Sequence, residues 1–176
     1  MKKFVFLLLT PFLLVACGSH SYLNYTEEVD LSSEQMTTYQ TTVEEIQPLL
    51  DALQAPEDDQ KLTLDVVSLA RAYSRLGQFG KAIAVYETTI EKGYRVRTLF
   101  HNVGRLYENV DEYEKAIESY GVMIDDYGDQ DYFFDIAWAY VKAGNAEGAR
   151  HNYDQWSLIK NKTDRQLEQA IDKLDQ

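Results

Sequence analysis

The sequence is poor in cysteine, in proline and in basic residues, and each shortage excludes a class of protein. Its 176 residues include 1 Cys and 3 Pro, and 17 Lys and Arg stand against 29 Asp and Glu, for a net charge of −12. A single cysteine excludes an intrachain disulfide framework and a zinc site built from several cysteines. The acidic balance lacks the basic stripe that nucleic acid binding requires, so we expect no nucleic acid partner. With 45% apolar residues, most of the chain is expected to fold as one domain.

The N-terminus has the features of an export signal. Lys2 and Lys3 precede an uncharged, mostly apolar run from Phe4 to Ala16, which is shorter than the roughly 20 residues of a membrane-spanning helix. The run ends in Leu-Val-Ala-Cys, with the cysteine at Cys17. This ending resembles the lipobox of bacterial lipoproteins, whose signal peptide, here residues 1–16, is cleaved and whose cysteine receives diacylglycerol and often a further acyl chain. The alternative is an ordinary signal peptide that ends in a cysteine by chance.

The lipobox resemblance implies a lipid-anchored protein of the bacterial cell envelope. Gly18 stands where an aspartate usually retains lipoproteins in the inner membrane, which predicts the outer membrane, facing the periplasm, in a Gram-negative cell. No Lys or Arg occurs between Phe4 and Gln60, where acidic residues are frequent, so anionic headgroups should repel this stretch. We therefore expect residues 17–35 to form an extended acidic tether, although a merely solvated leader predicts the same behaviour.

A repeat of about 34 residues organises the rest of the chain. Residues 69–73, 103–107 and 136–140 align with one another, with steps of 34 and 33 residues. Each segment is followed by an alanine and then by a tyrosine four residues later, namely Ala82 with Tyr86, Ala116 with Tyr120, and Ala149 with Tyr153. This pattern resembles the tetratricopeptide repeat, a 34-residue helix–turn–helix unit. The resemblance implies an all-α, tetratricopeptide-like α-solenoid, with three repeats over residues 63–161.

The residues of each repeat favour the same architecture without the resemblance. The first helix of each repeat has apolar or small residues at i, i+3, i+4 and i+7, which form one buried stripe. In the first repeat this stripe is Val66, Leu69, Ala70 and Tyr73. The small residue lets the partner helix approach closely, and tight turns between the two helices are predicted at Gly77, Asp111 and Gly144.

Further helices are expected on both sides of the repeats. Residues 36–62 are assigned to an N-terminal helical cap, which follows a possible capping box at Ser32 and is kinked or restarted by Pro48. This segment is either a degenerate half-repeat or a true cap. Residues 162–176 are assigned to a C-terminal capping helix that begins with a capping box at Thr163, and we expect Trp156 to pack against it.

The sequence contains no motif of a known catalytic or cofactor site. The phosphate-binding loop, the dinucleotide-binding glycine motif, the zinc-protease helix and the nucleophile elbow are all missing. We therefore expect no enzymatic activity, no cofactor, no metal and no small-molecule substrate.

The first helices of such repeats line a concave face on which extended peptides or helices dock. Eight residues are predicted to line this groove: Arg71, Arg75, His101, Asn102, Arg105, Asn109, Trp138 and Lys142. The carboxylates are expected elsewhere, on the leader and the second helices. The cations and amides are similar in type to those with which chaperone-binding relatives hold a peptide carboxylate, although the clamp is incomplete. The groove is thus predicted to bind an acidic segment or a C-terminus, unless these are ordinary solvent-facing residues.

The sequence as a whole supports one main hypothesis of function. The chain is expected to act as an adaptor or scaffold that recruits a protein or peptide partner at the envelope membrane. The alternative is a structural component that self-associates through its tyrosine-rich or capping surfaces. An envelope enzyme or sugar-binding protein is a third reading, which no residue set supports.

Overall fold

The computed structural model describes residues 21–52 and 60–176, and these residues are helical apart from their turns. The predicted signal peptide, Cys17 and the expected turn before the first repeat lie outside the described residues. The elements are η1 (Ser21–Asn24), α1 (Ser33–Asp51), α2 (Gln60–Arg75), α3 (Phe79–Glu91), α4 (Arg97–Asn109), α5 (Tyr113–Asp125), α6 (Tyr132–Lys142), α7 (Ala146–Lys160) and α8 (Arg165–Leu174). No strand occurs within the described ranges, which confirms the all-α class.

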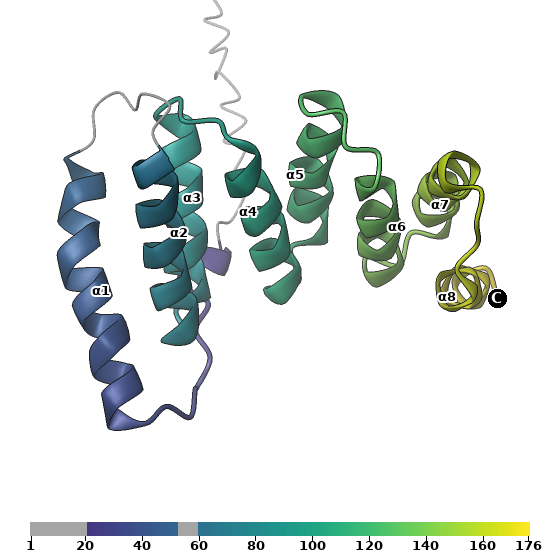
Figure 1. The fold of residues 1–176 in the computed structure, drawn as a ribbon. Helices are drawn as coiled ribbons and strands as arrows, with labels where there is room; N and C mark the ends of the chain where they lie inside the picture. Colours follow the sequence, from purple (N-terminus) through teal and green to yellow (C-terminus); the bar gives the residue numbers. More distant parts are fainter. Residues whose placement is uncertain (1–20, 53–59) are drawn as a thin grey trace, which may run out of the picture.

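The helices form a single row in which each one packs on the next (Figure 1). Three antiparallel hairpins make up the centre of the row: α2 with α3, α4 with α5, and α6 with α7. Helix α1 packs on the first hairpin, and α8 packs on the last one. This arrangement confirms the predicted tetratricopeptide-like solenoid.

The three turns within the hairpins share one backbone conformation. Gly77, Asp111 and Gly144 have positive φ angles of 72°, 59° and 74°. Glycine adopts this left-handed conformation freely, and aspartate is among the few other residues that tolerate it. In each turn the following N–H donates to the carbonyl of the stripe tyrosine, as Gln78 does to Tyr73 at 2.9 Å.

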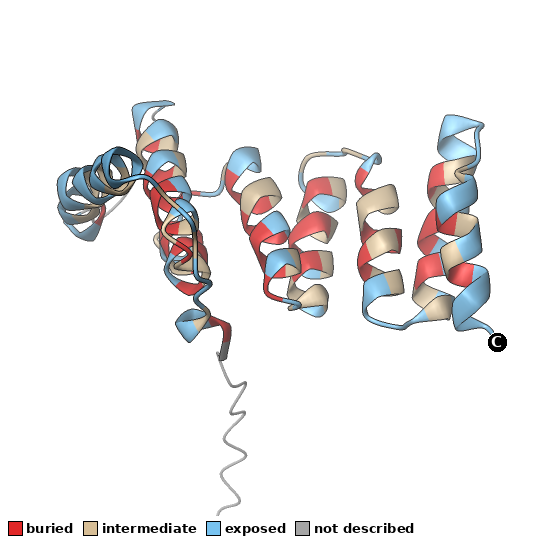
Figure 2. Ribbon diagram, turned by 90° about the horizontal axis from the view of Figure 1, so that it is seen from below, coloured by how far each residue is buried: buried red, intermediate tan, exposed pale blue. Residues whose placement is uncertain are grey.

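The core lies between the two layers of helices, where buried residues face one another along the row (Figure 2). The three predicted alanines of the second helices, Ala82, Ala116 and Ala149, are fully buried. The first two stripes are buried throughout, whereas Phe133 and Tyr140 of the third stripe are half-buried. The third repeat is less covered because it packs on the short helix α8 instead of on another hairpin.

The prediction of an extended acidic tether is wrong over residues 21–31. Tyr22 is 2% exposed, within the main core cluster, and η1 packs on α3. The backbone of Glu27 donates to Gly77, and that of Gly80 donates to Tyr25. The net acidity of the segment hid two apolar and aromatic anchors that outweigh the tendency of its carboxylates to stay in water.

Both terminal helices begin with side-chain caps. The hydroxyl of Ser32 accepts from the N–H of Gln35, and the Gln35 side chain accepts from Ser32 in return, so the predicted capping box of α1 is present. Helix α1 continues through Pro48 up to Asp51. At α8 the capping residue is Asp164, not Thr163, and its carboxylate accepts from Leu167 at 2.9 Å.

Trp156 joins the last hairpin to the terminal helix. It is buried in one cluster with Leu167 and Ile171 of α8, and its ring lies 4.7 Å from that of Phe134. The exposed side of α8 is polar, with Gln166, Gln169 and Lys173 in solvent. The stack therefore ends on a surface that water solvates well.

Replacement of Gly104 by alanine tests the packing within the second hairpin. A Cβ at Gly104 would lie 2.5 Å from the fully buried ring of Tyr120, whereas nothing lies within 4 Å of a Cβ at Gly121. We expect Gly104→Ala to lower the free energy of unfolding by about 1–3 kcal/mol through overpacking. Gly121→Ala should raise it by about 0.5–1 kcal/mol, because alanine favours the helix. Urea denaturation measures both, and equal effects would contradict the assigned packing.

Candidate functional site

Four of the eight predicted groove residues line one hollow between the first two repeats. This hollow, called the basic groove below, has a volume of about 350 Å³. Its lining comes from α2, α3 and α4 and consists of Val67, Ala70, Arg71, Ser74, Arg75, Phe79, Tyr86, Asn102, Arg105 and Leu106. The groove has an apolar floor and a rim of three cations and an amide.

Helical spacing brings the polar residues of the basic groove together. Arg71 and Arg75 lie four residues apart on α2, and Asn102 and Arg105 lie three apart on α4, so each pair shares one helix face. The three arginines are exposed, and within the described residues none of them has a carboxylate within 4.0 Å. Their guanidinium groups are therefore free to bind an anionic group.

Tyr86 forms the inner end of the basic groove. Its side chain is 3% exposed. Burial raises the pKa of Tyr86 to about 12, and a hydrogen bond from Asn102 and the charge of Arg71 oppose that rise. The phenol is therefore neutral at physiological pH, and Asn102 and Arg71 lie close to its oxygen.

The continuation of the groove toward the third repeat is neutralised by carboxylates. Lys142 donates to Glu108 at 2.6 Å, and the phenol of Tyr120 donates to the other oxygen of Glu108 at 2.8 Å. Asp135 also lies here, and its pKa is raised by burial and by Glu108, while Arg105 opposes this. The expectation that carboxylates avoid the first helices is thus wrong in this half of the groove, because Glu108 and Asp135 both lie on them.

The remaining predicted residues have other surroundings. Nδ1 of His101 lies 2.6 Å from the Tyr132 hydroxyl, and burial, with Arg105 and Arg97, lowers the pKa of His101. Trp138 is half-buried against the C-terminal cluster and is not the exposed aromatic that was expected. Asn109 is exposed at the end of α4 and does not line the hollow.

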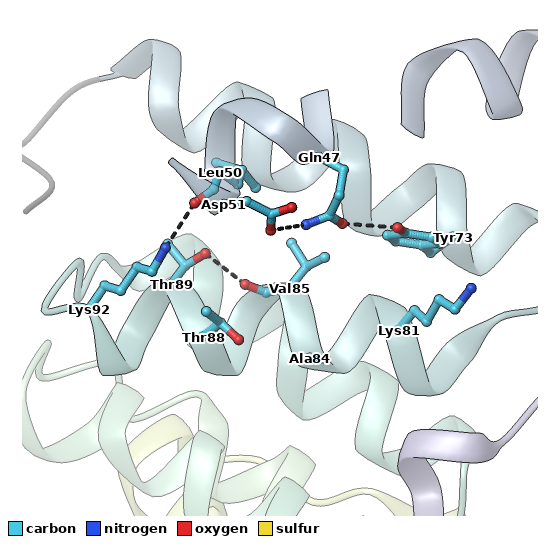
Figure 3. Close-up of a pocket in the computed structure, with 10 residues that line it drawn as sticks. All are labelled: Gln47, Leu50, Asp51, Tyr73, Lys81, Ala84, Val85, Thr88, Thr89 and Lys92. Atoms are coloured by element: carbon cyan, nitrogen blue, oxygen red, sulfur yellow. Dashed lines mark hydrogen bonds between the residues drawn. The ribbon is translucent and has the colours of Figure 1, made fainter. Parts of the chain in front are cut away.

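A second pocket of about 210 Å³ lies between α1, α2 and α3 (Figure 3). Tyr73 donates to Gln47 at 2.9 Å, Gln47 donates to Asp51 at 2.6 Å, and Lys92 donates to the Leu50 carbonyl at 2.9 Å. These bonds use the polar groups of the pocket to fasten α1 to the first repeat. We assign this pocket a structural role.

Sequence reasoning missed two aromatic walls of the basic groove and one glycine. Phe79 and Tyr86 line the groove from the second helix of the first repeat, which was expected to face away from it. Gly80 makes room for the N-terminal segment, since a Cβ there would collide with the backbone oxygens of Tyr22 and Leu23. The signal for Gly80 was present in the repeat alignment, because the equivalent positions are Glu114 and Glu147.

Two further features are not found among the described residues. No group of three His, Cys, Asp or Glu side chains there is placed to hold a metal ion. None of the helices in the described ranges combines the length and the apolar character needed to cross a membrane.

Comparisons with known proteins agree with this architecture. Residues 66–97 and 98–121 each match a sequence profile of the tetratricopeptide repeat. A solved tetratricopeptide repeat protein from Parabacteroides merdae is similar in fold, with a TM-score of 0.56 and 19% identity over 79% of this chain. The chain spans about 60% of that protein's length. No curated protein matches the sequence.

The chain is thus a tetratricopeptide-repeat protein with the fold of an all-α solenoid. Repeats of this kind indicate a protein–protein interaction adaptor or scaffold, and the fold is generally non-catalytic.

Raising the pH above 10 tests the burial of the tyrosines. Burial raises the pKa of Tyr86 to about 12, and it also raises that of Tyr120, whereas phenols in the unfolded chain titrate near 10. The stability that these neutral phenols contribute is fully present below about pH 10 and is lost as the pH rises toward about 12. We expect the urea midpoint to fall over this range. Phenolate absorbance from every tyrosine at pH near 10 in the folded protein would contradict the assignment.

Proposed function

We propose that this protein is a lipid-anchored adaptor of the bacterial cell envelope that binds an acidic protein segment in the basic groove. The observation that carries the proposal is the convergence of Arg71, Arg75 and Arg105 on one groove without a carboxylate partner in the described part of the chain. Arginine binds carboxylates through two parallel hydrogen bonds, and Asn102 adds a further donor.

The apolar floor favours an extended peptide over a free anion. Val67, Phe79 and Leu106 lie below the arginines, so a segment with an apolar side chain next to its carboxylates would contact both floor and rim. An acidic side chain or a C-terminal carboxylate would supply the anionic group. The neutralised half of the groove, with Lys142 held by Glu108, supports confining this contact to the first two repeats.

Charge reversal in the basic groove tests the binding site. Arg71→Glu with Arg105→Glu should abolish binding of a fluorescent acidic peptide that ends in a free carboxylate, because each arginine is replaced by a repelling group. Both side chains are exposed, so the helicity should not change. Fluorescence anisotropy measures the binding, which should also weaken as salt screens the charges.

The matched control places the same charge change on the terminal helix. Arg165→Glu with Lys173→Glu alters two exposed cations of α8, away from the groove. We expect this variant to bind the peptide as the unmodified protein does. An equal loss of binding in both variants would show that net charge, not the groove, determines recruitment.

The lipid anchor is tested by replacing the cysteine. We propose that Cys17 carries the lipid, as its lipobox-like context predicts, so Cys17→Ser should move the protein from the detergent phase to the aqueous phase. Phase partitioning and intact mass spectrometry of the membrane fraction measure the two effects. Firm membrane retention of Cys17→Ser would contradict lipid anchoring at this residue.

A further inference from the structure

The N-terminal segment binds the first hairpin through a chain of specific contacts. The hydroxyl of Tyr22 donates to Glu87 at 2.7 Å and accepts from Lys115 at 2.8 Å. The Lys115 ammonium lies 4.1 Å from the centre of the Tyr22 ring, and Tyr107 packs edge-on against the same ring at 5.7 Å. A tyrosine that is nearly fully buried and bonded from both sides is an anchor for the residues next to it.

The backbone of the same segment is held by the turn of the first hairpin. Glu27 donates to the Gly77 carbonyl at 2.8 Å, and Gly80 donates to the Tyr25 carbonyl at 3.2 Å. A Cβ at Gly80 would collide with the carbonyl oxygens of Tyr22 and Leu23, so only glycine permits this approach. Residues 22–27 therefore form a docked strap.

The order of these contacts gives the strap a direction. From Glu27 back to Tyr22, its partners move from Gly77 to Gly80 and then to Glu87. The chain thus ascends α3 toward its carboxyl end as the residue number falls. Beyond that end lies the α3–α4 turn, residues 92–96, which has basic residues and no carboxylate.

We propose that the strap holds the solenoid directly against the bilayer, with the α3–α4 turn facing the lipid surface. The proposal rests on the proposed lipidation of Cys17. Five residues separate Cys17 from Tyr22, and five residues of chain span at most about 18 Å. Without the strap, the first fixed point would be the start of α1 at Ser33, and sixteen residues span up to about 55 Å. The strap therefore replaces a long tether by a short mount and leaves the basic groove to the partner.

A fluorescent label on a single cysteine tests this orientation. Because Cys17 is the only cysteine and would carry the lipid, an added thiol is labelled alone. Thr98→Cys places the label on the exposed start of α4, and Gln169→Cys places it on the exposed side of α8. The full lipidated protein is reconstituted in phosphatidylethanolamine–phosphatidylglycerol vesicles that contain a lipid with a nitroxide quencher on its headgroup. We expect strong quenching at position 98 and much weaker quenching at position 169.

Gly80→Glu releases the strap while retaining a repeat-like hairpin. Glutamate is compatible with this position of the second helix, as Glu114 and Glu147 of the other repeats indicate. We expect the variant to lose most of the quenching at position 98 and to gain rapid amide hydrogen exchange over residues 22–27. The matched control is Gly121→Glu, which places the same residue where nothing lies within 4 Å of the Cβ and should behave as the unmodified protein does. If Gly80→Glu fails to fold, Tyr22→Ala serves instead, because it removes the group that Glu87 and Lys115 bind.

Each outcome bears on the proposal. Position-dependent quenching that is lost with the strap supports it. Equal quenching at the two positions, or unchanged quenching after exchange shows residues 22–27 to be released, overturns the orientation but leaves lipidation intact. An intact mass without lipid on Cys17 overturns the anchor and, with it, the proposed mount. Mass spectrometry on the same sample separates these two failures.

Discussion

The close approach of the two helices in each hairpin is the constraint on which the rest of the structure depends. In the second hairpin Gly104 of the first helix faces Tyr120 of the second, and in the third the roles are exchanged, with Gly148 facing Tyr140. A side chain at either glycine would come within 3 Å of the opposing ring. The large residue fills the space that the small one leaves, which gives dense packing without strain. This contact sets the spacing of the first helices and therefore the width of the groove between them.

The groove formed by the first helices is divided by its charges. In its first half, three arginines face solvent around an apolar floor, whereas in its second half Lys142 is bound to Glu108 and Asp135 lies nearby. A cation that already has a carboxylate partner at 2.6 Å gives up that bond when it binds another, so it adds little net free energy to recognition. The number of basic residues on the face therefore overstates the surface that can recognise an acidic partner.

The periodic features of the fold could be predicted from the sequence, and the non-periodic ones could not. Stripe, alanine and turn positions recur every 33 or 34 residues, and each has a local physical reason, so three hairpins were predictable. The pairing of Lys142 with Glu108 depends on how far the first helices of neighbouring repeats are offset, which side-chain spacing within one helix does not fix. The docking of Tyr22 joins residues 65 and 93 positions apart, and it lies in a segment whose acidity suggests solvation. Composition averages over such a segment, whereas one buried aromatic with two polar partners decides its position.

The strap and the basic groove share a wall, although they lie on different helices. Phe79, the first residue of α3, lines the groove beside Arg75, and its ring packs edge-on against Tyr25 of the strap at 6.0 Å between centroids. The glycines on either side of this phenylalanine, Gly77 and Gly80, are the two that receive the strap backbone. Docking of the strap thus limits the positions open to the Phe79 ring, which forms part of the surface that a partner would meet. In this molecule the element that follows the proposed anchor and the element proposed to bind a partner are built around the same turn, so the orientation of one constrains the shape of the other.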